Sequence, residues 1–375
     1  MTLVVLTEIV LGLWLATALL YQIAAEIALS QILSGAPEKR AAPLPSATIL
    51  TSLDEGIPRL EENLRRLCET GAPVIAGAES GSEALAVAQR VHERVPAGRL
   101  RIVSGSGLAG SNRKVATLIP MMPEASGEIV IFTDADIGVP VGYREAVLSP
   151  FADSEVGMVT CPYRSVGGAS VAARIDAMLT NASFLPSVAL AARFEGVRFA
   201  LGATMAIRRT VLDQIGGLEP LLEVLADDWS LAERTRRAGH RIVLSPILLD
   251  HHVGEPGWAA LWQRHLRWAR TMRALRPSGY AGTIVAHGLA PALGLAMLDG
   301  GATGVGALAA WLLVRAGGVL LNARRTGCHT LEILLLPLTD LFSLALYVGG
   351  LCGRSVRWGG SRLRVGPGGA ILARV

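Results

Sequence analysis

In the stretch Ile129-Val-Ile-Phe-Thr-Asp134-Ala-Asp136, four apolar residues come shortly before two acidic residues. Continuous apolar runs rich in β-branched residues are typical of buried strands in a parallel α/β sheet. In such sheets, ligands bind just beyond the carboxyl ends of the strands, where Asp134 and Asp136 would lie. Two carboxylates at this spacing can hold a divalent cation that also binds diphosphate oxygens, although Asp is also common in solvated turns. The stretch therefore predicts an α/β fold and raises the hypothesis of a metal site.

The same strand pattern recurs on both sides of this stretch and alternates with helical patterns. Strands are predicted at 47–51, 73–78, 100–103, 156–161, 199–207 and 240–244, and helices at 57–68, 82–95, 112–122, 174–192 and 225–238. Strands that alternate with helices indicate a parallel, doubly wound sheet. Gly202 interrupts one predicted strand, and such a glycine marks a point where the backbone can approach a ligand closely.

The two ends of the chain are more apolar than a soluble enzyme requires. Hydrophobic residues make up 51% of the sequence and the mean hydropathy is +0.43, which indicates membrane segments. The apolar segment at the N-terminal end, residues 1–28, lacks the basic start and the cleavage site of a signal peptide, so a retained membrane anchor is expected. Lys39 and Arg40 follow this anchor and place the next domain in the cytoplasm by the positive-inside rule.

After the soluble pattern, an amphipathic segment interleaves Trp and Arg residues, which fits the membrane–water interface. Two spans are predicted beyond it, at 281–298 and 302–321. A third apolar stretch, 331–351, contains Glu332 and Asp340 and could equally re-enter the membrane or lie on its surface. The predicted order is a transmembrane helix at 1–28, a linker at 29–45, an α/β domain at 46–257, an interfacial helix at 258–279, membrane segments at 280–352 and a basic cytoplasmic tail at 353–375.

Charge and cysteine content exclude several classes of protein. The formal net charge is only +4, and the basic residues form no patch interleaved with aromatic residues of the kind that binds nucleic acid. The four cysteines show no paired spacing, so neither a disulfide framework nor a zinc site is indicated. We therefore expect no nucleic-acid partner.

Several short motifs occur in an informative order. Asp134 lies in Thr-Asp-Ala-Asp, Asp228 lies in Ala-Asp-Asp-Trp, and Arg264-His-Leu-Arg267-Trp268 follows. Supporting motifs are Asn112-Arg-Lys114, Gly202-Ala-Thr-Met and Val211-Leu-Asp-Gln-Ile-Gly-Gly-Leu. In this order the chain resembles the ceramide glucosyltransferase group of family 2 and family 21 glycosyltransferases, and within it the bacterial hopanoid-biosynthesis-associated enzymes. That family has three spaced acidic positions followed by (Gln/Arg)-X-X-Arg-Trp.

The resemblance implies a GT-A-type, Rossmann-like cytoplasmic catalytic domain with membrane helices at both ends. It also implies a UDP-sugar donor, a Mn²⁺ or Mg²⁺ ion, and location in the bacterial inner membrane as a multi-pass protein. One departure concerns the first acidic position, usually Asp, which here is Glu79. The family holds the nucleoside in this region, so Glu79 is expected to contact the nucleotide sugar.

Sugar transfer from a nucleotide requires a stabilised diphosphate and a base for the acceptor hydroxyl. A cation on Asp136, oriented by Asp134, would act as the Lewis acid. Asp228, at a helix start near the carboxyl edge of the sheet, is the candidate base; its neighbour Asp227 could instead cap the helix. With one base and no separate nucleophile, the transfer should invert the anomeric centre.

Other residues have weaker assignments. Arg267 could pair with the diphosphate bidentately and Trp268 could stack on sugar or acceptor, or both could simply anchor an interfacial helix. His251 or His252 could supply a third metal ligand, and we assign His252 to the metal site. Lys114 could meet the nucleotide phosphates or remain solvated. Arg264 and Gly202 are also assigned to nucleotide-sugar binding.

Two other protein classes fit less well. A transporter would need most of its chain in the bilayer, whereas the middle of this chain has a soluble pattern. A Rossmann dehydrogenase needs Gly-X-Gly-X-X-Gly after its first strand, and the nearest match, 104–110, follows the third. The expected reaction is therefore transfer of a sugar to a membrane lipid, with N-acetylglucosamine onto a hopanoid polyol such as bacteriohopanetetrol favoured and glucose onto ceramide as the alternative.

Overall fold

The computed structural model describes residues 2–35, 43–105, 108–328 and 330–374. The chain divides into two compact units. The helical unit comprises Met1–Leu33, Gly168–Arg193 and Glu255–Val375, and the sheet unit comprises Ser34–Gly167 and Phe194–Gly254. Lys39, Arg40 and part of the glycine-rich stretch 104–110 lie outside the described residues.

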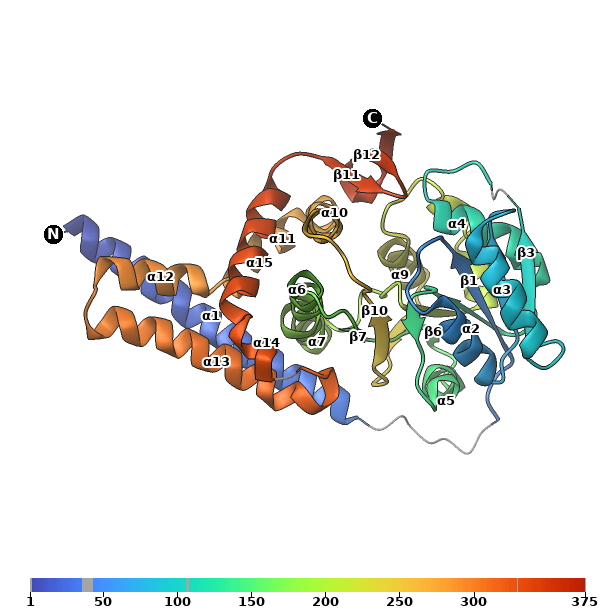
Figure 1. The fold of residues 1–375 in the computed structure, drawn as a ribbon, viewed down its shortest axis with the longest axis horizontal. Helices are drawn as coiled ribbons and strands as arrows, with labels where there is room; N and C mark the ends of the chain where they lie inside the picture. The colour runs from blue at the N-terminus through green and yellow to red at the C-terminus, as the bar shows by residue number, and fades with distance from the viewer. Residues whose placement is uncertain (1, 36–42, 106–107, 329, 375) are drawn as a thin grey trace. The chain divides into compact units, whose positions relative to one another are not determined.

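The sheet unit is built on a seven-stranded sheet in the order β3-β2-β1-β4-β8-β6-β9 (Figure 1). The strands are β1 (Ala47–Leu53), β2 (Val74–Ala78), β3 (Leu100–Ser104), β4 (Ile129–Thr133), β6 (Val156–Thr160), β8 (Thr204–Arg208) and β9 (Arg241–Leu244). All five residues of β4 are buried, as their continuous apolar sequence predicts. The predicted α/β fold class is confirmed.

The direction of β8 differs from the parallel sheet that the sequence pattern predicts. β1 to β4 pair in parallel, but β8 runs antiparallel to both β4 and β6. Because β6 is thereby parallel to β4, the chain leaves β6 and enters β8 at the same edge of the sheet. Gly202 consequently lies in the turn before β8, not within a strand, and this turn is beside the carboxyl end of β4.

Helices cover both faces of this sheet. The helices α2 (Leu60–Glu69), α3 (Glu83–Arg94) and α5 (Tyr143–Leu148) bury their apolar side chains in one core. The helices α4 (Arg113–Leu118), α8 (Arg209–Gln214) and α9 (Asp227–Arg237) do so in a second core on the other face. Short 3₁₀ segments are η1 (Ile119–Glu124), η2 (Ser149–Ala152) and η4 (Glu219–Leu221). The sheet is therefore doubly wound, as predicted.

A second, three-stranded sheet continues from the end of β4. It has the order β5-β10-β7, with β5 (Ile137–Gly138), β7 (Tyr163–Val166) and β10 (Leu249–His252). β10 pairs antiparallel with β5, so that His251 faces Ile137 in the register. This pairing brings a segment from late in the chain beside Asp136.

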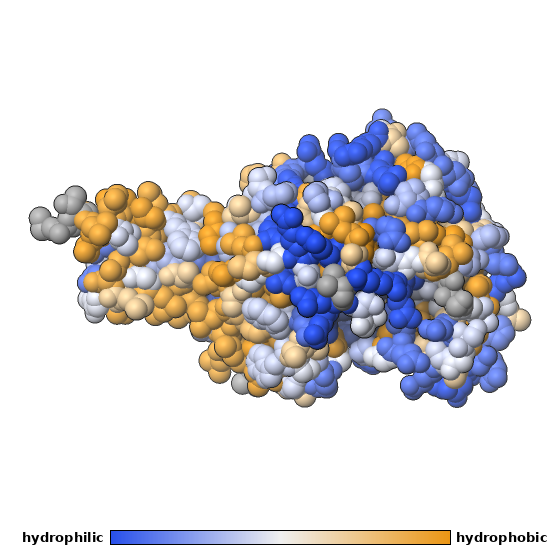
Figure 2. Space-filling view, turned by 90° about the horizontal axis from the view of Figure 1, so that it is seen from above, coloured by the Kyte–Doolittle hydropathy of each residue, from blue (hydrophilic) through white to orange (hydrophobic). Residues whose placement is uncertain are grey.

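The helical unit contains a bundle of three apolar helices, two of them long. In α1 (Thr2–Ser34), α12 (Leu289–Leu298) and α13 (Ala302–Thr326), apolar residues including Leu15, Leu289 and Trp311 pack together (Figure 1). Their outward side chains include Leu13 and Leu313, which are 66% and 72% exposed. Figure 2 shows hydrophobic residues gathered on the visible face of this bundle, as expected for helices that face lipid.

The remaining elements of this unit surround the bundle. They are α6 (Val171–Leu179), η3 (Thr180–Phe184, a π-helical turn), α7 (Leu185–Glu195), α10 (Trp258–Leu275), α11 (Pro277–Gly282), η5 (Thr283–Ala286), α14 (Thr330–Leu334), α15 (Leu336–Leu351), β11 (Ser355–Trp358), β12 (Ser361–Val365), η6 (Pro367–Gly369) and β13 (Ile371–Arg374). The predicted α/β domain at 46–257 had included α6 and α7, but residues 168–193 belong to the helical unit, where α6 packs against α10, α13 and α15. The reason is their composition: apart from Arg174, Asp176 and Arg193 to Glu195, the segment has no charged residue.

Three helices are long and apolar enough to span a membrane among the described residues, namely Leu3–Ser34, Val171–Glu195 and Ala302–Thr326. A fourth span is possible if the bent pair Pro277–Ala286 and Leu289–Leu298 counts as one, although its two parts meet at 51°. The predicted span at 281–298 is thus broken, and the apolar stretch 331–351, which was expected to span, re-enter or lie on the membrane, is divided into α14 and the 16-residue α15. The predicted tail at 353–375 forms a three-stranded antiparallel sheet, β11-β12-β13.

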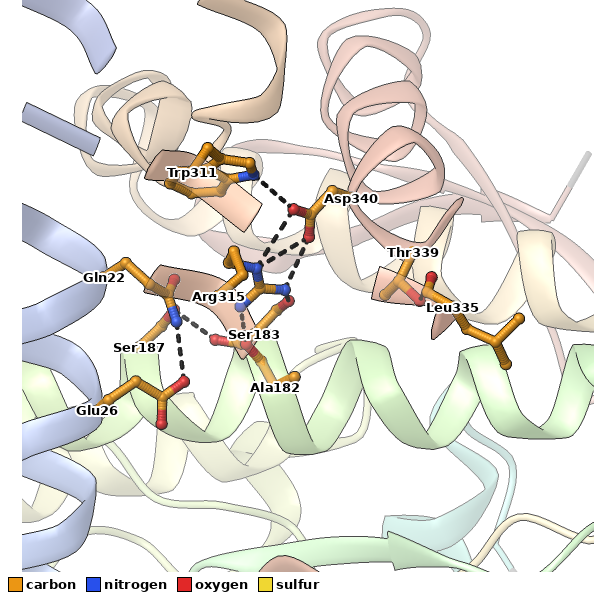
Figure 3. A network of polar contacts seen from close by, with 10 residues as sticks. All are labelled: Gln22, Glu26, Ala182, Ser183, Ser187, Trp311, Arg315, Leu335, Thr339 and Asp340. Atoms are coloured by element: carbon orange, nitrogen blue, oxygen red, sulfur yellow. Dashed lines mark hydrogen bonds and ion pairs between the residues drawn. The ribbon is translucent and has the colours of Figure 1, made fainter. Parts of the chain in front are cut away.

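Charged residues inside the helical unit are paired with one another (Figure 3). Arg315 of α13 donates to both carboxylate oxygens of Asp340, at 2.7 to 3.3 Å, and to the backbone oxygen of Ala182. Trp311 Nε1 also donates to Asp340, at 2.9 Å, and Gln22 donates to Glu26 at 2.8 Å. A buried charge is tolerated only when it is paired and hydrogen-bonded, and this pairing explains how Arg315 and Asp340 occur within apolar segments.

Candidate active site

Acidic residues gather at the carboxyl edge of the large sheet in the sheet unit. Asp54 follows β1, Glu79 follows β2 and Asp134 follows β4. The strands deliver these side chains to one edge because β1, β2 and β4 are parallel, and the same edge is where ligands bind in open α/β sheets. Asp54 was not among the predicted site residues, although its place directly after a buried strand is the same signal that singled out Asp134.

Lys114 lies at the centre of the acidic group. Its Nζ is 2.6 Å from Asp134 Oδ1 and 3.3 Å from Asp227 Oδ2, and only 14% of its side chain is exposed. Asn112 caps α4 by accepting from Val115 N, which fixes the helix that carries Lys114. Burial by itself would lower the pKa of Lys114, but the charges of Asp134 and Asp227 outweigh this effect and raise it. Lys114 is therefore a permanent cation that partly neutralises the group, rather than a solvated lysine.

Asp228 lies in the first turn of α9 and faces the same space. Its Oδ1 accepts a hydrogen bond from Trp229 N at 2.7 Å. Burial and, secondly, the charge of Asp227 raise the pKa of Asp228 to about 6. A carboxylate with this pKa is a suitable proton acceptor near neutral pH. Asp227 does not cap the helix, because Ala226 is the N-cap residue and Asp227 pairs with Lys114.

Gly202 leaves the space between these groups open. A Cβ atom at this position would lie 3.3 Å from Asp134 Oδ2, 3.7 Å from Asp228 Oδ2 and 3.7 Å from Lys114 Nζ. Any side chain would therefore fill the volume that the three polar groups share. Glycine keeps that volume accessible to a ligand.

Asp136 has a buried carboxylate oxygen that no described residue satisfies. Its Oδ2 is 3.3 Å from His251 Nε2, whereas its buried Oδ1 has no hydrogen-bond partner among the described residues. Burial raises the pKa of Asp136, but hydrogen bonding and charge from His251 outweigh it, so the pKa is lowered and the carboxyl group stays ionised. An ionised, buried oxygen without a donor fits a divalent cation.

His251, and not the assigned His252, lies against Asp136. His251 Nδ1 is also 3.1 Å from Ser165 Oγ, which orients the ring. Neighbouring residues of a strand point to opposite sides of the sheet, so His252 points away from the side chain of Asp136. Its Nε2 lies next to Gly138, 2.8 Å from the point where a Cβ atom on that glycine would be. The described residues contain no group of three or more His, Cys, Asp or Glu side chains arranged for a metal ion, so a cation here would need ligands from its substrate or from water.

Glu79 lies farther out. It is 64% exposed and its Oε2 is 3.2 Å from Arg113 Nη2. Arg113 is the neighbour of Lys114 on α4, so one short helix supplies cations to three of the acidic residues. This exposed position is compatible with contact to a nucleoside at the rim of the site.

The Arg264-to-Trp268 motif lies on α10 in the helical unit. Arg264 Nη1 is 3.0 Å from Asp176 Oδ2, and the guanidinium of Arg267 lies 5.8 Å from the ring centre of Trp358. Further along α10, Arg270 and Arg273 donate to backbone oxygens at the end of α15, including that of Cys352 at 3.0 Å. These arginines therefore secure the C-terminal end of α15, a role that the interpretation as an interfacial helix had not included.

A mixed, doubly wound sheet with acidic residues at its carboxyl edge defines a GT-A-like glycosyltransferase fold. The chain belongs to glycosyl transferase family 21, whose model matches residues 10–371. Family 21 is the ceramide glucosyltransferase family, and the protein is accordingly a glycosyltransferase.

A solved structure shares the fold, the mannosyltransferase PcManGT from Pyrobaculum calidifontis in complex with GDP-Man and Mn²⁺, with a TM-score of 0.53 and 19% identity over 92% of this chain and 97% of that chain. At this identity the likeness concerns the fold alone. The chain is also similar, at a TM-score of 0.44 that carries no argument, to GalNAc-T7 with UDP, GalNAc and Mn²⁺, with 15% identity over 62% of this chain and 51% of that chain.

Proposed function

We propose that this protein is an inverting, metal-dependent membrane glycosyltransferase that moves a sugar from a UDP-sugar to a lipid hydroxyl. The observation that carries the proposal is the shared space at Gly202, which Asp134, Asp228 and Lys114 face. A second observation supports it: Asp136 Oδ1 has no hydrogen-bond partner among the described residues. The space combines an excess of negative charge with a candidate base. The donor class and the cation are supported by PcManGT, which was solved with a nucleotide sugar and Mn²⁺.

Asp136 and Asp134 would hold the cation, either Mn²⁺ or Mg²⁺. When bound, the ion supplies Lewis-acid stabilisation to the diphosphate leaving group. Lys114 holds Asp134 through the 2.6 Å ion pair and thereby limits the repulsion among the carboxylates. Glu79, Arg264 and Gly202 are proposed to contact the nucleotide sugar.

Asp228 would serve as the base. It takes the proton of the acceptor hydroxyl while the acceptor oxygen bonds to the anomeric carbon. The bond from that carbon to the diphosphate oxygen breaks, and the nucleoside diphosphate leaves with the electron pair. Because the acceptor attacks directly, the anomeric configuration inverts. Arg267 and Trp268 are proposed to stabilise the diphosphate and to stack on the sugar or acceptor.

The acceptor is proposed to be a lipid at the cytoplasmic face of a bacterial inner membrane. Three helices in the described chain are long and apolar enough to span a bilayer, and Arg324 and Arg325 lie in the last turn of α13, in line with a cytoplasmic end by the positive-inside rule. A hopanoid polyol that receives N-acetylglucosamine is favoured by the motif resemblance. Ceramide that receives glucose is the second candidate, because the chain belongs to the ceramide glucosyltransferase family.

A donor-by-acceptor matrix tests these assignments. Purified protein in lipid nanodiscs would be given UDP-N-acetylglucosamine or UDP-glucose with a hopanoid polyol, ceramide or a water-soluble sugar alcohol, and products identified by mass spectrometry. We expect transfer of N-acetylglucosamine to the hopanoid polyol. Transfer to ceramide alone would replace the favoured acceptor by the second candidate, and transfer only to the soluble acceptor would overturn the lipid assignment.

A further inference from the structure

Asp176 is a buried carboxylate in an apolar helix. It lies on α6, only 1% of its side chain is exposed, and its neighbours Ile175 and Ala173 are fully buried. Removing an ionised carboxylate from water costs several kcal/mol unless partners compensate. The partners of Asp176 should therefore explain why an acid occurs here.

Both partners come from the Arg264-to-Trp268 motif on α10. Asp176 Oδ1 is 2.7 Å from His265 Nε2, and Asp176 Oδ2 is 3.0 Å from Arg264 Nη1. One carboxylate thus contacts two consecutive motif residues, His265 by a hydrogen bond through Oδ1 and Arg264 by an ion pair at Oδ2 that lacks hydrogen-bond geometry. This arrangement fixes the rotation of α10 about its own axis relative to α6, because a turn of α10 would break both contacts.

The contact continues from His265 to Trp268. The two rings meet edge to face, with centroids 4.8 Å apart and planes at 74°. Residues three apart lie on the same side of a helix, so the imidazole that Asp176 holds forms one wall against the indole. The hydrogen bond to Asp176 therefore limits the rotation of His265 and, through it, the positions open to Trp268.

We propose that Asp176 is a positioning residue for sugar transfer, which fixes the guanidinium of Arg264 directly and the indole of Trp268 through His265. The proposal rests on the proposed function, in which Trp268 acts on the sugar or acceptor. Asp176 touches neither substrate nor reacting atoms. Its contribution is to hold the motif in the productive geometry, and small misplacements of such groups cost up to about 100-fold in rate.

A double-mutant cycle on the full-length protein in nanodiscs tests the proposal. The variants are Asp176→Asn, His265→Phe, Trp268→Phe and the combinations of each of the first two with Trp268→Phe. His265→Phe keeps a ring against Trp268 and leaves the Asp176–Arg264 pair intact, so it serves if Asp176→Asn folds poorly. We would measure kcat and KM for the nucleotide sugar together with the thermal midpoint of unfolding.

Glu332→Gln provides a matched control. Glu332 Oε1 is 2.9 Å from Arg174 Nη1, so this change breaks another ion pair of the same helix without touching the motif. It should alter kcat less than twofold. Asp176→Asn and His265→Phe should each lower kcat about 10- to 100-fold. His265→Phe should leave KM within threefold and should not lower kcat further in the Trp268→Phe background, whereas Asp176→Asn should also raise KM for the nucleotide sugar and should keep in that background the part of its loss that acts through Arg264.

The outcomes distinguish a positioning role of Asp176 from a purely structural role. Additive losses of His265→Phe and Trp268→Phe, or a kcat loss in Glu332→Gln as large as in Asp176→Asn, would show that Asp176 only stabilises the helical unit and would overturn the inference. A loss in Trp268→Phe without one in Asp176→Asn and His265→Phe would overturn the inference and leave the proposed function intact. Full activity of Trp268→Phe would overturn both the role of the motif and the inference built on it.

Discussion

The two units hold polar clusters of opposite character. In the helical unit, Arg315 and Asp340 match one positive charge with one negative charge, and both carboxylate oxygens have donors. In the sheet unit, four carboxylates surround Lys114 and His251, and Asp136 Oδ1 has no partner among the described residues. The four are Asp134, Asp136, Asp227 and Asp228.

This difference separates a structural cluster from a site. A buried pair that satisfies itself needs no ligand and holds helices together, which is the usual use of polar groups between membrane helices. A cluster with surplus charge is unfavourable until a cation or a ligand enters. Perturbed carboxyl groups around an open space therefore indicate function, whereas burial of charge alone does not.

The largest expected effect comes from removing the cation ligand. Asp136→Asn should lower transfer by about 10³-fold, since Lewis-acid stabilisation contributes several kcal/mol and each ~1.4 kcal/mol is a factor of ten. The fold should persist, because the substitution also removes charge repulsion. Radiolabelled sugar transfer measures the loss, and the thermal midpoint checks the fold. Full activity after chelation of divalent cations would contradict the assignment.

Loss of the base should be nearly as severe. Asp228→Asn should lower kcat about 10²- to 10³-fold, because an amide cannot take the acceptor proton. Nucleotide binding, measured by calorimetry with UDP and Mn²⁺, should remain within a few-fold. Asp227→Asn is the neighbouring control and should retain most of the activity. If Asp227→Asn loses activity and Asp228→Asn retains it, Asp227 is the base.

The paired cluster should respond in stability instead of rate. Asp340→Asn should lower the free energy of unfolding by about 3 kcal/mol, because it leaves the buried Arg315 without a counter-charge. The folded fraction should keep its kcat. Thermal unfolding in nanodiscs measures the first quantity, and activity normalised to folded protein measures the second. A large fall in normalised kcat with an unchanged midpoint would show that this cluster belongs to the reaction.

Local patterns predicted the elements that carry the site. The apolar run 129–133 is β4, the Asp-Asp pair opens α9, and the amphipathic segment from Trp258 is α10. Each prediction used neighbours within one turn or one strand, where periodicity and caps decide the structure. The position of Asp134, Asp136 and Asp228 at one edge followed from the α/β pattern.

Contacts between distant segments were not predictable in this way. The antiparallel course of β8 moved Gly202 from a strand to a turn, and the register of β10 on β5 brought His251 rather than His252 to Asp136. The role of Asp176 was not predicted, because its partners lie 88 and 89 residues later in the sequence. Pairing depends on which strands and helices meet, and one sequence contains no direct record of that.

The smallest expected effect is on the pH profile, and it tests why Asp228 differs from a surface carboxylate. A base acts in its ionised form, so kcat/KM should fall as the pH drops through the pKa of Asp228, which burial and Asp227 raise to about 6. One protonation predicts about a tenfold loss at pH 5 relative to the plateau. A cation bound nearby favours the ionised form of Asp228, which lowers its pKa and moves the acid limb of the pH profile to lower pH.

Asp227→Asn sharpens the same test, because the charge of Asp227 raises the pKa of Asp228. Removing that charge should displace the acid limb to lower pH while the plateau changes little. The profile would be measured as kcat/KM from pH 4.5 to 8 at fixed Mn²⁺, with Glu332→Gln as a charge-removing control whose limb should not move. An acid limb that moves to higher pH in Asp227→Asn, or that stays unchanged, would mean that the titrating group is not Asp228.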